Sequence, residues 1–255
     1  MIVDIHAHIG HHPIHEYDQE PEKLLAVMDR FGVEKCFLMP FPSMRVREVN
    51  DMIAKAVDTN PDRFVGFACI DPSAEDDIDE VSRAVDIGLK GIMVDPEFHR
   101  VFGRRFRFLP EIEDIMIPCV EHGLPVLFNT PNIEVGESAS FMFGGTWAPY
   151  SVGLKHLVQR FPEVKFIVNI IWPGALDLMK EYQNIILDTG GQNGISQALT
   201  ETIQEVGPMR ICFGSETPQN HPAIGIKYIQ YLTLKPIYRE LVLGKNAERI
   251  FKELF

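Results

Sequence analysis

An acidic residue and two histidines alternate near the start of the chain, in the sequence Asp4-Ile5-His6-Ala7-His8. If this segment is a β-strand, alternation places Asp4, His6 and His8 on one face. Two imidazoles two residues apart on one face can bind a single zinc-like ion. A metal site needs further ligands, so the motif predicts partners elsewhere in the chain. The alternative is a histidine pair in a buried polar network.

Short apolar segments alternate with longer amphipathic ones and predict the elements that position these histidines. Nearly continuous apolar strands are typical of a parallel sheet buried on both faces. Eight strand–helix units in 255 residues predict an α/β fold, a (β/α)8 TIM barrel, with residues 1–255 as a single domain. An open, doubly wound sheet is the structural alternative. The expected strands are 2–8, 35–41, 64–70, 90–95, 125–130, 165–171, 184–189 and 210–216.

The active site of such a barrel lies at the C-terminal ends of its strands. Polar residues at these ends are therefore the candidates for chemistry, ahead of other polar residues. They are His6, His8, Asp71, Asp95, Asn129, Asn169, Asp188 and Glu216.

Composition narrows the classes of partner. A formal net charge of −12, from 24 Lys and Arg against 36 Asp and Glu, argues against nucleic acid and anionic membranes. The four cysteines form no C-x-x-C pair and predict buried, reduced thiols in a cytoplasmic protein. No signal segment or membrane-length apolar run is expected.

Six segments in order resemble the amidohydrolase superfamily, in its amidohydrolase-related branch of decarboxylases and hydrolases, which includes aminocarboxymuconate-semialdehyde decarboxylase. The resemblance spans nearly the whole chain and implies a barrel of the metal-dependent-hydrolase type. The segments are DIHAH (4–8), GLKGIMVDP (88–96), LPVLFNT (124–130), FPEVKFIVNIIWPG (161–174), RICFGSETP (210–218) and GKNAERIF (244–251).

The chain departs from the pattern of this family at several strand ends. Asn129 stands where the family presents a metal-binding histidine, and Ile170 where it presents a catalytic histidine. Glu216 replaces an aspartate, and Asp95 stands in a strand that lacks the family's lysine and histidine. Alternation predicts that Asn169, next to Ile170, points away from the site.

The residues that are kept predict a site for one divalent metal, expected to be zinc. The site is weakened because several of the family's ligand positions are substituted. Its ligands would be His6, His8 and Glu216, with Asp95 or Asn129 helping. Glu216 is one methylene longer than aspartate, so its carboxylate must fold back or be displaced. Glu216 and Asp95 are also the candidate catalytic groups. No organic cofactor is expected.

Two segments near the barrel mouth supply candidate substrate contacts. Arg104 and Arg105 lie in the arginine-rich segment 97–108, and guanidinium groups suit carboxylates. Trp147 lies in the long connection 131–150, which suits a lid over an apolar ligand. The arginine-rich segment is also compatible with a solvated surface or a subunit contact, and the aromatic segment with a contact in a homo-oligomer.

Three further histidines, His11, His12 and His15, lie in a loop without an acid or cysteine at ligand spacing. We expect them to be solvated rather than to form a second metal site.

Three functions are consistent with these residues. The first is an amidohydrolase-like hydrolase or decarboxylase acting on a small, anionic carbonyl compound such as an amide, lactone or carboxylic acid. The second is a catalytically inactive barrel with a binding or scaffolding role, which the substitutions favour. The third is a metal-independent lactonase with Asp95 or Glu216 as base. A nuclease of the same superfamily fits the net charge poorly.

Overall fold

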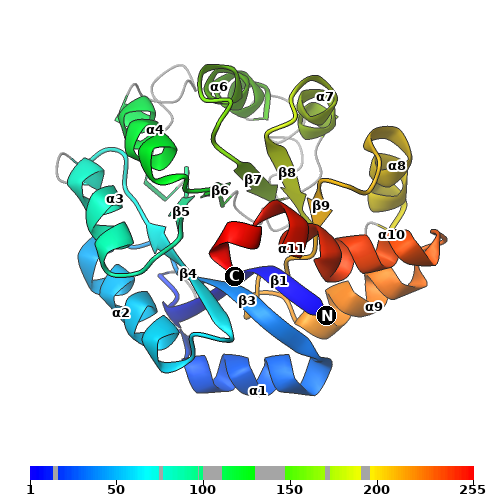
Figure 1. The fold of residues 1–255 in the computed structure, drawn as a ribbon, viewed down its shortest axis with the longest axis horizontal. Helices are drawn as coiled ribbons and strands as arrows, with labels where there is room; N and C mark the ends of the chain where they lie inside the picture. The colour runs from blue at the N-terminus through cyan, green and yellow to red at the C-terminus, as the bar shows by residue number, and fades with distance from the viewer. Residues whose placement is uncertain are drawn as a thin grey trace.

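Parallel strands follow one another around a nine-stranded sheet in chain order, and the short strand β2 pairs antiparallel with β1 (Figure 1). The structure is a computed structural model that describes residues 1–13, 17–74, 77–96, 98–99, 111–129, 147–169, 173–190 and 196–255. The strands are β1 (Ile2–His11), β2 (Asp18–Gln19), β3 (Val33–Pro40), β4 (Phe64–Cys69), β5 (Gly91–Val94), β6 (Val126–Phe128), β7 (Phe166–Asn169), β8 (Ile185–Asp188) and β9 (Ile211–Cys212).

The segment that follows β9 returns to β1 and closes the sheet. Ala7 and Thr217 form a parallel bridge. The amide of His8 donates to the carbonyl of Thr217 over 2.7 Å, and the amide of Ile5 donates to the carbonyl of Phe213 over 2.9 Å. The fold is therefore the predicted (β/α)8 barrel, because an open sheet would leave its first and last strands unpaired. The expected strand 210–216 pairs with β8 only over β9, and its remainder bonds to β1.

Helices surround the barrel as an outer ring (Figure 1). The first of them begins at Pro21, whose fixed φ suits the first helical turn, and ends where Gly32 adopts a left-handed φ of 71°. The described helices are α1 (Pro21–Phe31), α2 (Val46–Thr59), α3 (Asp77–Asp86), α4 (Glu111–His122), α6 (Trp147–Arg160), α7 (Pro173–Glu181), α8 (Ser196–Val206), α9 (Pro222–Tyr231), α10 (Pro236–Glu240) and α11 (Asn246–Ile250), with a π-helix at Leu241–Lys245 and a 3-10 turn at Lys252–Leu254.

Strand side chains divide into two apolar clusters. The outer cluster packs between the sheet and the helices. The inner cluster fills the barrel with side chains from β1 and β3 to β9, as the layered interior of such barrels requires. Phe251 and Leu254 join it and close the N-terminal end of the barrel, where the C-terminus lies in Figure 1. The strand residues of the inner cluster are Val3, Ile5, Phe37, Met39, Val65, Phe67, Cys69, Met93, Leu127, Ile167, Ile186 and Cys212.

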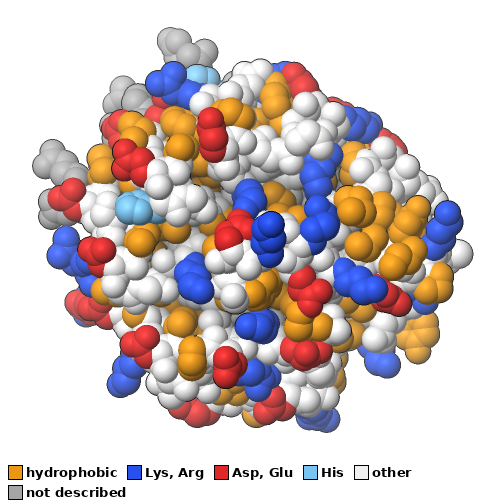
Figure 2. Space-filling model, viewed as in Figure 1, with side chains coloured by type: hydrophobic (Ala, Val, Ile, Leu, Met, Phe, Trp, Pro, Cys, Tyr) orange, Lys and Arg blue, Asp and Glu red, His pale blue; other side chains and the backbone are white. Residues whose placement is uncertain are grey.

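Acidic and basic side chains are interspersed over the face of the molecule seen in Figure 2. Mixed charges of this kind are typical of a surface in contact with water. In the described part of the chain, no helix is both long and apolar enough to cross a membrane.

Candidate active site

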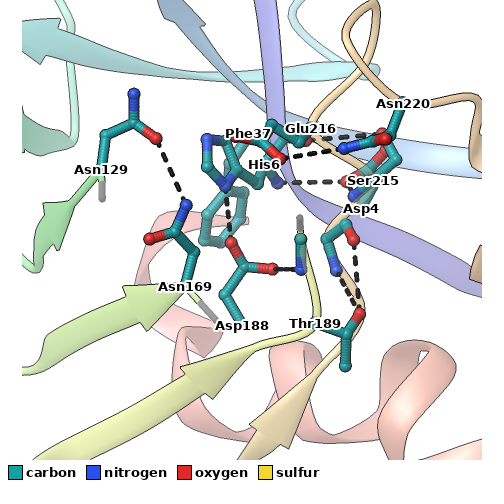
Figure 3. Close-up of polar contacts among 12 residues, drawn as sticks. Asp4, His6, Phe37, Asn129, Asn169, Asp188, Thr189, Ser215, Glu216 and Asn220 are labelled. Carbon is teal, nitrogen blue, oxygen red and sulfur yellow. Dashed lines mark hydrogen bonds and ion pairs between the residues drawn. The ribbon is translucent and has the colours of Figure 1, made fainter. Parts of the chain in front are cut away.

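His6 and His8 lie side by side in the barrel, and both side chains are buried. Their Nε2 atoms are 2.9 Å apart. Nδ1 of His6 bonds to Oδ2 of Asp188 over 2.6 Å (Figure 3). Nδ1 of His8 bonds to the carbonyl of Pro40 over 3.0 Å. Carboxylate and carbonyl oxygens accept, so both Nδ1 atoms carry hydrogen and both neutral rings turn an Nε2 lone pair toward the other.

Two lone pairs at this distance repel unless a cation lies between them. Two nitrogens bound to one tetrahedral ion at about 2.0–2.1 Å would lie about 3.3 Å apart, within a few tenths of an ångström of the distance between this pair. Metal-binding histidines generally donate their second N–H to a carboxylate or a backbone carbonyl, as both do here. The pair therefore fits a divalent ion, with Asp188 and the carbonyl of Pro40 orienting the two ligands.

The charges around the pair distinguish the two imidazoles. Burial opposes the charged form of His6, but Asp188, with smaller contributions from Glu216 and Asp4, outweighs burial and raises its pKa. Burial, with His6 next to it, lowers the pKa of His8 to about 3. When no metal is bound, a proton shared by the pair therefore resides on His6.

The backbone of β1 is irregular next to this pair. Its register against β3 shifts between Asp4 and Ala7. Ile5 packs in the inner cluster and Ala7 in the outer one, so strict alternation is interrupted. Asp4 is thereby separated from the histidines, and its Oδ1 accepts from the amides of His6 and Ser215 over 3.1 and 2.8 Å. The expectation that Asp4 shares their face is corrected by this irregularity, which is of a kind common beside active sites.

Asp188 was one of the candidates at the strand ends, but the sequence reasoning gave it no role beside the histidine pair. It ends the buried strand β8, and its Oδ1 accepts from the amide of Gly190 over 2.8 Å. A Cβ atom at Gly214 would lie 2.0 Å from the same oxygen, so this close packing requires glycine there. A lone carboxylate at the end of the apolar run Ile185–Asp188 was the available signal.

Asp95, Asn129 and Asn169 form a chain of side-chain hydrogen bonds across the ends of three strands. Asn129 Nδ2 donates to Oδ2 of Asp95 over 3.1 Å, and Asn169 Nδ2 donates to Oδ1 of Asn129 over 3.3 Å (Figure 3). The expectation that Asn169 points away is wrong. Ile167 lies in the inner cluster, so Asn169, two residues further on, shares its inward face. Ile170 lies outside the described residues.

Glu216 is buried beside β1, where its amide donates to the carbonyl of His6 over 2.7 Å. Its backbone adopts a left-handed φ of 60°, and its Oε2 accepts from Nδ2 of Asn220 over 3.0 Å (Figure 3). Among the described residues, no three His, Cys, Asp or Glu side chains are grouped to hold a metal. The expected set of His6, His8 and Glu216 is thus not assembled there, and a ligand or base role for Glu216 stays a prediction.

Aromatic rings line the site next to His8. The ring of Phe41 stacks on His8 with centroids 5.0 Å apart, and His12 lies 4.7 Å from Phe41. His12 is buried, and the side-chain amide of Gln219 donates to its Nε2 over 2.9 Å, so the expectation that it is solvated is wrong. His11 is exposed as expected, and His15 lies outside the described residues.

The expected substrate contacts are not tested by the described residues. Arg104 and Arg105 lie outside them, and Trp147 begins α6 without a described side chain. Their roles stay predictions.

The fold and the histidine pair define a (β/α)8 barrel of the metal-dependent-hydrolase type. The chain belongs to the amidohydrolase family, whose model matches residues 3–252.

Proteins named as decarboxylases are among those similar to this chain. It is 24% identical over 285 aligned positions to a gamma-resorcylate decarboxylase from Rhizobium sp. (strain MTP-10005), covering 89% of this chain and 86% of the relative. The solved 2,6-dihydroxybenzoate decarboxylase from Rhizobium is similar with a TM-score of 0.76 and 20% identity over 99% of this chain and 98% of that one. A dihydroxybenzoic acid decarboxylase from Polaromonas sp. JS666, solved with bound manganese and 2-nitroresorcinol, has a TM-score of 0.73 and 18% identity over 98% and 96% of the two chains.

Proposed function

We propose that this protein is a decarboxylase of small aromatic carboxylic acids that depends on one divalent metal ion. The observation that carries the proposal is the buried pair of His6 and His8, whose Nε2 atoms lie 2.9 Å apart while both Nδ1 atoms bond to oxygen acceptors. Support for decarboxylation comes from the relatives, which are named for that reaction on hydroxylated benzoates. Manganese in one of them favours a divalent ion of this kind at least as much as zinc.

The reaction breaks the bond between an aromatic carbon and its carboxylate. The electron pair of that bond stays on the ring carbon, carbon dioxide leaves, and a proton takes its place. A divalent ion, when bound, supplies Lewis-acid stabilisation of negative charge on substrate oxygens. His6 and His8 would hold it, and Asp188 would keep His6 in the tautomer that binds.

The amides of Asn129 and Asn169 lie along the chain of side-chain hydrogen bonds that ends at Asp95. An amide presents both donors and acceptors, so this chain suits a polar, hydroxylated ligand. The ring of Phe41 suits the flat face of an aromatic one. Proton delivery to the ring carbon is assigned to Asp95 or Glu216, the two buried carboxyl groups that the sequence predicts for acid–base chemistry.

Two alternative functions make different predictions. A binding or scaffolding barrel without turnover is favoured by the missing third ligand among the described His, Cys, Asp and Glu residues. A metal-independent lactonase would use Asp95 or Glu216 as base. Both predict that turnover of a carboxylic acid does not respond to metal.

A metal-dependent decarboxylation assay tests the proposal. Chelated protein is reloaded with Mn²⁺ or Zn²⁺ and incubated with benzoates that carry hydroxyl groups at different ring positions, while carbon dioxide release is measured. We expect release that requires the ion, with deuterium incorporated at the vacated carbon in D₂O. Ligand binding without turnover would favour the inactive barrel, and metal-free lactone hydrolysis would favour the lactonase.

Replacing Asp188 with asparagine should weaken metal binding about 10- to 100-fold, the usual cost of losing the residue that orients a ligand histidine. Asparagine no longer fixes the N–H of His6 on Nδ1. Metal titration calorimetry measures the change. Asp18→Asn is the matched control, because Asp18 also bonds to Nδ1 of a histidine, His11, but on the surface. Equal metal affinity in the wild type and Asp188→Asn would contradict the assigned role.

The proposal also includes a cellular compartment and binding partners. The four cysteines are buried and form no disulfide, which supports a reducing compartment such as the cytoplasm. A homo-oligomer and a small-molecule partner stay predictions.

A further inference from the structure

Asp4 is a buried carboxylate at the seam where the barrel closes, and the proposed reaction gives it no part. The residue is 2% exposed. Its Oδ1 accepts two backbone amides, that of His6 over 3.1 Å in its own strand and that of Ser215 over 2.8 Å in the segment that follows β9 (Figure 3). One carboxylate oxygen therefore bonds to both sides of the seam.

The backbone of β1 explains why the amide of His6 bonds to a side chain. Positions 4 and 7 of β1 pair with positions 36 and 38 of β3, so three steps along β1 match two steps along β3. The extra residue of such a bulge is left without a partner in the backbone ladder. A buried amide without an acceptor is costly, and the aspartate two positions before it supplies one.

The hydrogen bonds around His6 form a closed cycle. The carbonyl of His6 accepts from the amide of Glu216 over 2.7 Å, while its amide donates to Asp4. Ser215, which directly precedes Glu216, donates its amide to the same oxygen of Asp4. Both backbone groups of His6 are thus bonded to the last strand segment, one directly and one through Asp4. The backbone of His6 cannot shift along the seam without breaking one of these bonds.

The position of this backbone decides where the ring of His6 lies. Its Nδ1 bonds to Asp188 over 2.6 Å, and its Nε2 lies 2.9 Å from that of His8. The surroundings are tight, because a Cβ atom at Gly190 would lie 3.2 Å from Nδ1 and one at Gly214 would lie 2.9 Å from the Cβ of His6. Binding groups must be held within about 0.5 Å of the productive geometry. A displaced backbone would therefore separate the two imidazoles.

We propose that Asp4 is a positioning residue for the metal site, whose carboxylate holds the backbone of His6 and the segment that carries Glu216 in one fixed arrangement. The inference rests on the proposed function, because it concerns the same divalent ion. It assigns to Asp4 neither a bond to the ion nor a proton transfer. Both partners of Oδ1 are neutral amides, so the site requires an acceptor oxygen at this point rather than a negative charge.

The test compares Asp4→Ala with Asp4→Asn. Alanine removes the acceptor, whereas asparagine keeps an oxygen that can accept from both amides. Affinity for Mn²⁺ is measured by titration calorimetry at a temperature at which each variant is folded. We expect binding about tenfold weaker in Asp4→Ala, the lower end of the usual cost of losing a group that supports a metal ligand. Asp4→Asn should recover most of that loss.

Asn246→Ala is the matched control. Asn246 is also fully buried and also bonds to two backbone groups, the carbonyls of Pro208 over 2.6 Å and Ile211 over 2.8 Å. These carbonyls lie at the beginning of β9, whereas Ser215 follows its end. We expect the control to lose stability in thermal unfolding, as Asp4→Ala does, and to keep the wild-type affinity for Mn²⁺. Equal weakening of Mn²⁺ binding in both variants would show a general loosening of the barrel and would overturn the assignment.

A signal from His6 itself gives a readout that needs no metal. The hydrogen on its Nδ1 lies in a short bond of 2.6 Å to Asp188, which moves its proton NMR resonance far downfield. The resonance is identified by its loss in Asp188→Asn. It should shift or broaden in Asp4→Ala and keep its wild-type position in Asp4→Asn and Asn246→Ala. Asp4→Glu keeps the charge but moves the oxygen by one methylene, so it should behave as Asp4→Ala and replaces it if alanine does not fold.

The outcomes separate this assignment from the proposed function. Unchanged Mn²⁺ affinity or an unchanged resonance in Asp4→Ala would overturn the assignment and leave the proposed function intact. Asp4→Asn as impaired as Asp4→Ala would also overturn it, because the charge and not the acceptor would then be required. Absence of Mn²⁺ binding in the wild type would overturn the proposed function, and with it the assignment to a metal site.

Discussion

Replacing His8 with alanine is expected to abolish stoichiometric binding of the divalent ion and to reduce turnover to the uncatalysed level. The substitution removes one of the two facing Nε2 atoms and leaves His6 without its neighbouring imidazole. Changes behind a ligand already cost about 10- to 100-fold in affinity, so loss of a ligand itself should cost at least that much. Metal content of protein purified without chelator, measured by elemental mass spectrometry, gives the result.

His12→Ala is the control for this experiment. His12 is also buried beside Phe41, but the amide of Gln219 donates to its Nε2, so that nitrogen is already engaged. We expect the control to retain the metal. Full metal occupancy in His8→Ala would show that the facing pair is only a structural contact.

Replacing Phe251 with alanine is expected to lower the free energy of unfolding by about 3–5 kcal/mol. The side chain is fully buried in the inner cluster, and its ring packs edge-on against Phe37 with centroids 5.2 Å apart. It closes the end of the barrel opposite the site, and alanine would leave a cavity among the side chains of the inner cluster. Urea-induced unfolding of the wild type and the variant measures the difference.

Phe255→Ala is the matched control, because Phe255 also lies near Phe37 but is 37% exposed. The control should lose much less stability, since its ring is already partly in water. A loss below about 1 kcal/mol in Phe251→Ala would mean that the C-terminal segment is not part of the barrel core.

Much of the fold was predictable because its signals are local. Each strand is a short apolar run, and the spacing of the runs requires helices between them. The pair of His6 and His8 was predictable for the same reason, since two residues separated by one share a face of any strand. The two imidazoles still meet although the register of β1 shifts between Asp4 and Ala7.

It was harder to predict from the sequence which residues of a strand point into the barrel. The run that ends at Asn169 and Ile170 is apolar on both faces, so its pattern does not reveal which residues point inward. Packing decided this when it placed Ile167 in the inner cluster and so turned Asn169 toward Asn129. Asp4 was misplaced because a register shift leaves no mark on the hydrophobic pattern.

The sequence by itself determined the barrel, the family resemblance and the histidine pair, because these follow from local periodicity and short motifs. Only the tertiary structure decided which groups meet. Asp188 reaches His6 across 182 positions of the chain, Glu216 turns to Asn220 on a left-handed backbone, and Ser215 is brought to Asp4. Hydrogen bonds between strand ends depend on how the strands are ordered around the barrel. No local pattern carries that information, because it arises only when the sheet closes.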